Sequence, residues 1–176
     1  MSAIEKNNKD TNQVQVPEGA RLLEILLVED NVADIILTRT ALRDSGILHH
    51  VEVAKDGKRA ITFLKQCGKN GGPKRPDIVL LDLNMPKVNG FQVLSEMYND
   101  SALQGIPVIV LSGSPPPVSS GAPIPKDMKA ACAHHPITYL LKPVLLKEYL
   151  ALIRVIREIC MLVGGANGSA DVRAAT

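Results

Sequence analysis

The sequence predicts an α/β fold in which a five-stranded parallel sheet carries helices on both faces, a doubly wound arrangement. Aliphatic runs of strand length alternate five times with segments whose apolar residues recur at helical spacing, all within residues 21–163. The first and third of these runs are apolar without interruption, as expected of central strands that are buried on both faces of a parallel sheet. We therefore expect one domain over residues 21–163.

The five strands and the first helices follow in order along this domain. Strands are expected at about residues 22–28, 51–54, 78–81, 108–111 and 138–141. The first helix has an apolar stripe and ends near Gly46; the stripe comprises Ala33, Ile36, Leu37, Thr40 and Ala41. Asp56 is a good N-cap for the second helix, whose stripe is Ala60, Phe63, Leu64 and Cys67. The third helix carries Phe91, Leu94 and Met97.

The last third of the domain is interrupted by proline. Residues 114–125 are too rich in Pro for a regular helix, so the fourth helix should be short, within residues 126–133. The fifth helix is expected to carry Leu146, Leu150, Ile153, Ile156 and Cys160. Residues 1–20 and 164–176 are polar or small and show no periodicity, so we expect a flexible N-terminal lead and a flexible C-terminal tail.

Composition and charge argue against several functions. Only 3% of residues are aromatic and the net charge of +2 is spread along the chain, so neither a stacking surface nor a basic patch for nucleic acid is expected. The three cysteines (Cys67, Cys132 and Cys160) are widely spaced, which is typical of buried reduced thiols. The chain shows neither a signal peptide nor an apolar run of membrane-spanning length, so a cytoplasmic location is predicted.

Polar side chains follow four of the aliphatic strands at the point where each strand ends. Glu29 and Asp30 follow the first strand, Asp82 the third, Ser112 the fourth and Lys142 the fifth. Because the carboxyl ends of parallel strands share one edge of the sheet, these side chains should converge where ligands bind in such folds. Three carboxylates in one pocket repel each other unless a cation or a proton neutralises them.

Each of these residues also has an ordinary structural explanation. An Asp after a strand often caps the next helix, and Asp30 could do so. A Ser in Ser112's position commonly begins a turn, and a single Lys such as Lys142 is most often a solvated charge. Their joint occurrence at equivalent strand ends favours a functional pocket.

This set of residues resembles the receiver domain of two-component response regulators. The resemblance covers about residues 22–163 and rests on motifs at several strand ends: the acid pair Glu29-Asp30, Asp82 ahead of Asn84-Met85-Pro86 and Gly90, Ser112, Tyr139, and Lys142-Pro143. It implies a flavodoxin-like sheet with strand order 2-1-3-4-5. It also implies that Asp82 is the nucleophile that accepts a phosphoryl group from a sensor histidine kinase in a Mg²⁺-dependent reaction.

The resemblance assigns further roles at the same edge. Mg²⁺ would be held by the carboxylates of Asp30 and Asp82, by the backbone carbonyl of Asn84, and by Glu29 through a bound water. Lys142 would pair with the phosphoryl oxygens.

Two residues would respond once the phosphoryl group has been transferred. Ser112 would donate a hydrogen bond to that group. Tyr139 would rotate into the space that Ser112 leaves, as a two-state switch; the less favoured alternative is that Tyr139 is a plain core aromatic.

A finer resemblance is to stand-alone receivers that partner phytochrome-type photoreceptor kinases, including bacteriophytochromes. Residues 28–34, 75–84 and 105–112 carry it. It implies a homodimer through the face of helix four, strand five and helix five. Because only a short polar tail follows the fifth helix and no long apolar run is present, we expect output through protein contacts and no membrane partner. The proline-rich stretch at 114–125 departs from the family pattern, and its role is open.

Other functions are also compatible with these residues. The protein could be a phosphorelay intermediate or phosphate sink that exchanges with a histidine phosphotransfer protein, or a pseudo-receiver that is never phosphorylated. A Mg²⁺-dependent phosphohydrolase of similar fold would need a second Asp two residues after the nucleophile, where this chain has Asn84. We therefore expect a phosphoacceptor that is not an enzyme towards other molecules and catalyses only its own phosphorylation and dephosphorylation.

Overall fold

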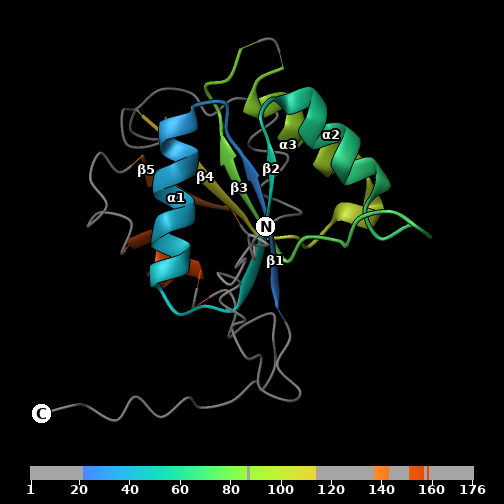
Figure 1. Cartoon of the computed structure of the whole chain (residues 1–176). Helices are drawn as coiled ribbons and strands as arrows, with labels where there is room; N and C mark the ends of the chain where they lie inside the picture. The colour runs from blue at the N-terminus through green and yellow to red at the C-terminus, as the bar shows by residue number, and fades with distance from the viewer. Residues whose placement is uncertain (1–21, 87, 114–136, 143–150, 157, 159–176) are drawn as a thin grey trace, which may run out of the picture.

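The computed structural model describes residues 22–86, 88–113, 137–142, 151–156 and 158 (Figure 1). Several predicted features lie outside these residues. They are the lead at 1–20, the tail at 164–176, the proline-rich stretch at 114–125, the fourth helix at 126–133, Cys132 and Cys160. Cys67 is described and is buried, as predicted.

A five-stranded parallel sheet forms the centre of the domain, and its strand order is β2-β1-β3-β4-β5. The strands are β1 (Leu23–Val28), β2 (His49–Ala54), β3 (Ile78–Asp82), β4 (Val108–Ser112) and β5 (Ile137–Leu141). The predicted fold class and strand order are confirmed. Strand β2 begins two residues earlier than predicted because it is a half-exposed edge strand whose first residues, His49 and His50, are polar.

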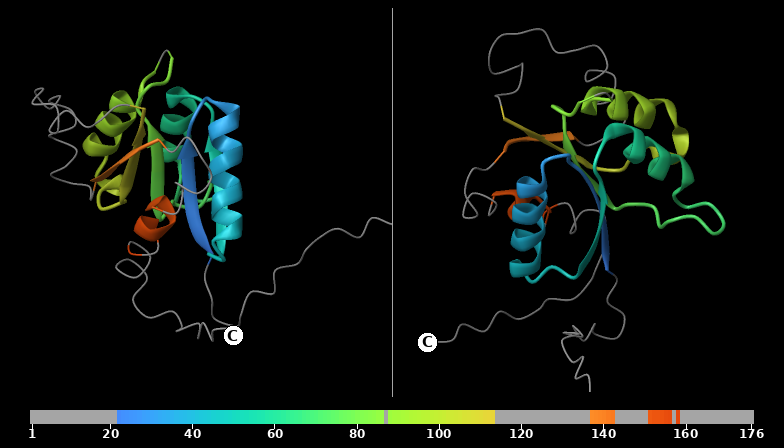
Figure 2. Two further views of the ribbon diagram at one scale, coloured as in Figure 1. Left: turned by 90° about the vertical axis from the view of Figure 1, so that its left-hand side faces the viewer. Right: turned by 45° about the horizontal axis from the view of Figure 1, so that its top comes forward.

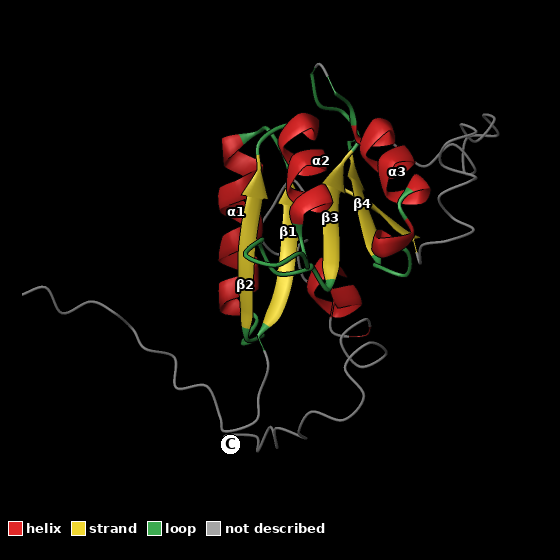
Figure 3. Cartoon of the chain, turned by 90° about the vertical axis from the view of Figure 1, so that its right-hand side faces the viewer, coloured by secondary structure: helices red, strands yellow, loops and turns green. Residues whose placement is uncertain are grey.

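Helices cover both faces of the sheet. Helix α1 (Val32–Asp44) and the helical residues 151–156 pack on one face, and helices α2 (Gly57–Gln66) and α3 (Gly90–Asn99) pack on the other (Figures 2 and 3). A short 3-10 turn at Ser101–Leu103 follows α3 and was not predicted. The strands therefore present an apolar side chain to each face in alternation.

That alternation divides the core into two clusters. In β1, Leu26 and Val28 join the cluster under α2 and α3, whereas Ile25 and Leu27 join the cluster under α1. The remaining central strands follow the same pattern, and all five residues of β3 and of β4 are buried. The rigid strand ends that carry the polar residues are thus fixed by packing on both sides of the sheet.

The predicted apolar stripe of α1 was mostly wrong. The residues that α1 buries are Ile35, Thr38, Ala41 and Leu42. Ile36, expected in the core, is 58% exposed. Aliphatic residues occur on more than one side of this helix, so their spacing alone does not determine which side meets the sheet. The stripes predicted for α2 and α3 are confirmed, as is the N-cap role of Asp56.

Gly90 is required by the close approach of α3 to the end of β3. A Cβ atom added to Gly90 would lie 2.7 Å from the Leu83 Cα and would collide with the carbonyl oxygen of Asp82. Its N–H donates to the Leu83 carbonyl oxygen at 3.2 Å. Any larger residue would push α3 away from the strand that carries Asp82.

We expect Gly90→Ala to lower the free energy of unfolding by about 1–3 kcal/mol, because backbone atoms cannot yield to the new methyl group. Urea denaturation followed by circular dichroism measures this change. Gly113→Ala is the matched control, since a Cβ at Gly113 would meet nothing within 4 Å. Equal stability of the two variants would contradict the close packing of α3 against β3.

Candidate functional site

Three carboxylates converge at the carboxyl edge of β1 and β3. Val28 and Leu81 pair across these strands, so the residues that follow them, Glu29 and Asp82, lie side by side. Glu29 is 1% exposed and Asp82 is 2% exposed, whereas Asp30 faces solvent. One carboxylate oxygen from each of the three residues lies within 4.8 Å of the others. The predicted acid cluster is therefore present.

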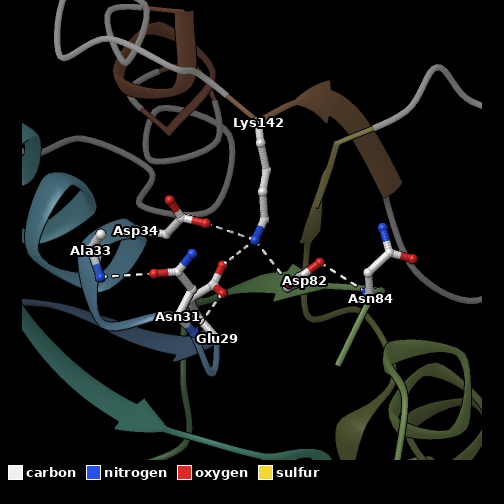
Figure 4. A network of polar contacts seen from close by, with 7 residues as sticks. All are labelled: Glu29, Asn31, Ala33, Asp34, Asp82, Asn84 and Lys142. Carbon is white, nitrogen blue, oxygen red and sulfur yellow. Dashed lines mark hydrogen bonds and ion pairs between the residues drawn. The ribbon is translucent and has the colours of Figure 1, made fainter. Parts of the chain in front are cut away.

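The ammonium group of Lys142 lies among these acids (Figure 4). Its Nζ contacts Glu29 Oε2 at 2.7 Å, Asp82 Oδ2 at 2.8 Å and Asp34 Oδ2 at 2.9 Å. Lys142 directly follows β5, and its backbone N–H donates to the Ser112 carbonyl oxygen at 2.7 Å, which anchors it at the end of β4. The side chain thus supplies the positive charge that the acid cluster requires.

The ionisation of the pocket reflects burial and these contacts. Burial raises the pKa of Glu29 above its ordinary value, and hydrogen bonds from Lys142 and from the Asn31 backbone only partly oppose this effect. Burial would lower the pKa of Lys142, but hydrogen bonds to Asp82, Glu29 and Asp34 outweigh it and raise that pKa. Lys142 is therefore charged at neutral pH, while Glu29 is poised to gain either a proton or a cation.

Backbone amides orient two of the carboxylates. The Asn31 N–H donates to Glu29 Oε1 at 3.0 Å, and the Asn84 N–H donates to Asp82 Oδ1 at 2.9 Å. Asn31 is also the N-cap of α1, since its side chain accepts from the Ala33 N–H at 2.9 Å. The interpretation of Asp30 as the cap of this helix is therefore wrong.

Ser112 and Tyr139 lie on the strands between Asp82 and Lys142. Ser112 is the last residue of β4 and is 2% exposed. Asp82 pairs in register with Leu111, the residue that precedes Ser112. Tyr139, in β5, is half-buried and packs against the core cluster under α2 and α3. These positions agree with the ones expected from the sequence, and the roles of both residues stay predictions.

Asp34 is the residue that the sequence reasoning missed. It lies in the first turn of α1, and its carboxylate reaches Lys142. Asp34 lies four residues after Asp30 in the sequence. The first turn of a helix that follows a strand lies at the same edge of the sheet as the end of that strand, so this spacing could have placed Asp34 near the acid cluster. An acidic residue in the first turn of a helix is common, so Asp34 by itself did not indicate a contact with Lys142.

The donor set fits a divalent cation. Carboxylate oxygens are hard ligands, which suit Mg²⁺ or Mn²⁺ better than the softer metals that prefer Cys or His. The three converging carboxylates carry more negative charge than one ammonium group neutralises. A cation of charge +2 would therefore be bound favourably here.

Comparison with known proteins identifies the family. The family model described as "Response regulator receiver domain" matches residues 25–154. Probable methanogenesis regulatory protein FilR2 of Methanothrix harundinacea is 36% identical over 134 residues, which cover 76% of this chain and 81% of FilR2. Response regulator Rcp1 of Synechocystis is 44% identical over 90 residues, or 51% of this chain and 61% of Rcp1, less than two thirds of that relative.

Solved structures give the same result. The phosphorylated cyanobacterial phytochrome response regulator RcpA aligns with a TM-score of 0.64 and 35% identity, covering 85% of this chain and all of that one. The Mn²⁺-bound form of response regulator Rcp1 aligns with a TM-score of 0.60 and 34% identity, covering 84% of this chain and 99% of that one. The chain belongs to the response regulator receiver family.

None of the helices in the described part of the chain has the length and apolar character needed to cross a membrane.

Replacing the ammonium group should destabilise the metal-free protein in a pH-dependent way. We expect Lys142→Met to lower the free energy of unfolding by about 1–3 kcal/mol near neutral pH, because buried carboxylates lose their counter-ion. A group whose pKa is raised in the folded state binds more protons there than when unfolded, so acid favours folding. The loss should therefore shrink as the pH is lowered from neutral towards the ordinary titration range of a carboxyl group, because Glu29 takes up a proton.

Urea denaturation across this pH range, with and without Mg²⁺, measures the effect. Saturating Mg²⁺ should restore part of the stability, since it binds only the folded state. Lys58→Met replaces an exposed lysine on α2 and is the matched control. A loss that does not change with pH would contradict the assigned electrostatic role of Lys142.

Proposed function

We propose that this receiver accepts a phosphoryl group on Asp82 from a sensor histidine kinase and signals through protein contacts. The observation that carries this proposal is the position of Asp82. It is a buried carboxylate at a strand end, 2.8 Å from a lysine ammonium and within a cluster of two further acids. Such a carboxylate is held and oriented for attack, while its neighbours provide ligands for a divalent cation.

The chemistry is a transfer between two nucleophiles. A carboxylate oxygen of Asp82 forms a bond to phosphorus as the bond from phosphorus to the donor imidazole nitrogen breaks, and the electron pair leaves with the imidazole. Repulsion between the carboxylate and the anionic phosphoryl group opposes this approach. Lys142, already in contact with Asp82, reduces the repulsion and is assigned to the phosphoryl oxygens after transfer.

Mg²⁺ is the proposed cofactor. Asp30, Asp82 and the backbone carbonyl of Asn84 would hold it, with Glu29 contributing through a water. When bound, Mg²⁺ neutralises charge on the oxygens of the transferring group. The Mn²⁺-bound form of the relative Rcp1 supports a divalent cation in this pocket.

Ser112 and Tyr139 are proposed to change their contacts after the phosphoryl group has been transferred. Ser112, at the end of β4, would donate its hydroxyl hydrogen to a phosphoryl oxygen. Tyr139 would then change rotamer on β5, which lies beside β4. A local charge change would in this way alter the edge of the sheet that is available to partners.

Incubation with acetyl phosphate and Mg²⁺ should add one phosphoryl group to the protein. Intact-mass measurement detects this adduct, and Asp82→Asn should abolish it because an amide oxygen is a poor nucleophile. Asp100→Asn is the matched control: Asp100 is the N-cap of the 3-10 turn, and Asn caps equally well. No adduct on the wild type, or an adduct on Asp82→Asn, would contradict the proposal.

A Mg²⁺-dependent phosphohydrolase is the alternative activity. It would show steady release of phosphate from a phosphate ester, with the nucleophile regenerated in each cycle. Asn84 stands two residues after Asp82, where that class needs a carboxylate, and Asn84 contributes its backbone N–H to Asp82 instead. The phosphoacceptor function is therefore favoured.

The proposed donor is a phytochrome-type kinase, because RcpA is described as a phytochrome response regulator and is 35% identical to this chain. A purified bacteriophytochrome kinase charged with radiolabelled phosphate should transfer the label to the wild type within minutes and should leave Asp82→Asn unlabelled. A kinase of another sensor class serves as the control. Faster transfer from that control kinase would contradict the phytochrome partnership. Onward transfer to a histidine phosphotransfer protein would identify a relay intermediate.

The protein is proposed to form a homodimer and to act in the cytoplasm. The dimer face predicted from helix four, strand five and helix five is supported by β5, a sheet edge on which Leu141 is 56% exposed. The described helical residues 151–156 pack on the face of the sheet that also carries α1. Phosphoryl transfer is placed in the cytoplasm because the ATP that charges sensor kinases is found there.

A further inference from the structure

Asp34 makes a contact that the phosphoacceptor function does not require. Its Oδ2 accepts a hydrogen bond from Lys142 Nζ at 2.9 Å, across 108 positions of sequence. Both side chains are partly shielded, at 24% exposure for Asp34 and 21% for Lys142. Holding a long lysine side chain in one geometry costs rotamer entropy, and for this reason exposed ion pairs contribute little to stability. The partly shielded contact between Asp34 and Lys142 therefore suggests a role in the pocket besides stabilising the surface.

The ammonium of Lys142 has no spare donor in this arrangement. A lysine ammonium has three N–H donors. Here they are matched by three carboxylate contacts, to Glu29, Asp34 and Asp82. To reach a phosphoryl oxygen on Asp82, Lys142 must give up one of these partners. Figure 4 shows Asp34 and Asp82 on opposite sides of the ammonium, so a shift towards one weakens the contact with the other.

Asp34 is the partner that Lys142 leaves at least cost. Glu29 is 1% exposed and would be left as a buried charge, whereas Asp34 is more accessible to water. Asp34 also lies in the first turn of α1, where the helix dipole favours a negative charge. Water and the N-terminal end of α1 can therefore stabilise the Asp34 carboxylate when Lys142 moves away from it.

We propose that Asp34 is a positioning residue that competes with the phosphoryl group on Asp82 for Lys142, and so limits how tightly this receiver holds its phosphoryl group. This inference rests on the proposed function. Asp34 acts on Asp82 through Lys142, which contacts both carboxylates. Its carboxylate keeps the ammonium in place before transfer and draws it back afterwards, which favours the unphosphorylated state.

Beryllofluoride, a non-covalent phosphoryl analogue, is the probe. At saturating Mg²⁺, titration calorimetry should show that Asp34→Asn binds beryllofluoride about fivefold to tenfold more tightly than the wild type, because a competing charge has been removed. Asp34→Glu keeps the charge and should stay within about twofold of the wild type. Asp44→Asn makes the same change at the far, exposed end of α1 and should have no effect.

A second measurement uses no ligand. If Asp34 contacts Lys142 in solution, Lys142→Met should destabilise the metal-free protein less in the Asp34→Asn background than in the wild type. Urea denaturation of the wild type, the two single variants and the double variant measures this coupling. It also shows that each variant folds.

The outcomes separate the two proposals. No beryllofluoride binding by the wild type overturns the proposed function and this inference with it. Binding by the wild type that is unchanged or weaker in Asp34→Asn overturns the inference alone. A gain in Asp34→Glu equal to that in Asp34→Asn also overturns it, because charge would then not be the cause. Additive destabilisation by the two substitutions overturns it as well.

Discussion

The contact between the Lys142 ammonium and three carboxylates is the interaction on which the rest of this site depends. Glu29, Asp34 and Asp82 all lie within 2.9 Å of the same nitrogen. Without that charge, two nearly buried acids would face each other at adjacent strand ends, and the pKa of at least one would rise until it took up a proton. The ammonium neutralises part of the negative charge of this cluster and contacts Asp82, the proposed nucleophile.

The parallel sheet makes this contact possible. Every strand ends at the same edge, so Asp34 and Lys142 meet there although they are 108 positions apart in the sequence. Packing on both faces fixes the strand ends, and the backbone N–H groups of Asn31 and Asn84 orient the carboxylates. Gly90 lets α3 approach the strand that carries Asp82. The pocket is thereby organised before any phosphodonor arrives, which lowers the cost of orienting groups during transfer.

Much of this arrangement could be predicted from the sequence, because uninterrupted aliphatic strands and the polar residues that end them carry strong signals. The sheet, the acid cluster and the position of Lys142 followed from such local patterns. The orientation of α1 did not, because Ile35 and Ile36 are equally apolar and only packing selects Ile35 for the core. The cap of α1 depends on side-chain direction, which local spacing does not encode. The spacing of Asp34 from Asp30 indicated the edge at which Asp34 lies, but not its contact with Lys142.

A crystal structure of the protein grown with Mg²⁺ would show directly whether the acid cluster and Lys142 form the metal and phosphoryl site. We expect one ion at about 2.1 Å from carboxylate oxygens of Asp30 and Asp82 and from the Asn84 carbonyl oxygen, with Lys142 still within hydrogen-bonding distance of the acids. An ion bound elsewhere would contradict it. So would a pocket in which Lys142 points to solvent and Glu29 and Asp82 are turned away from each other.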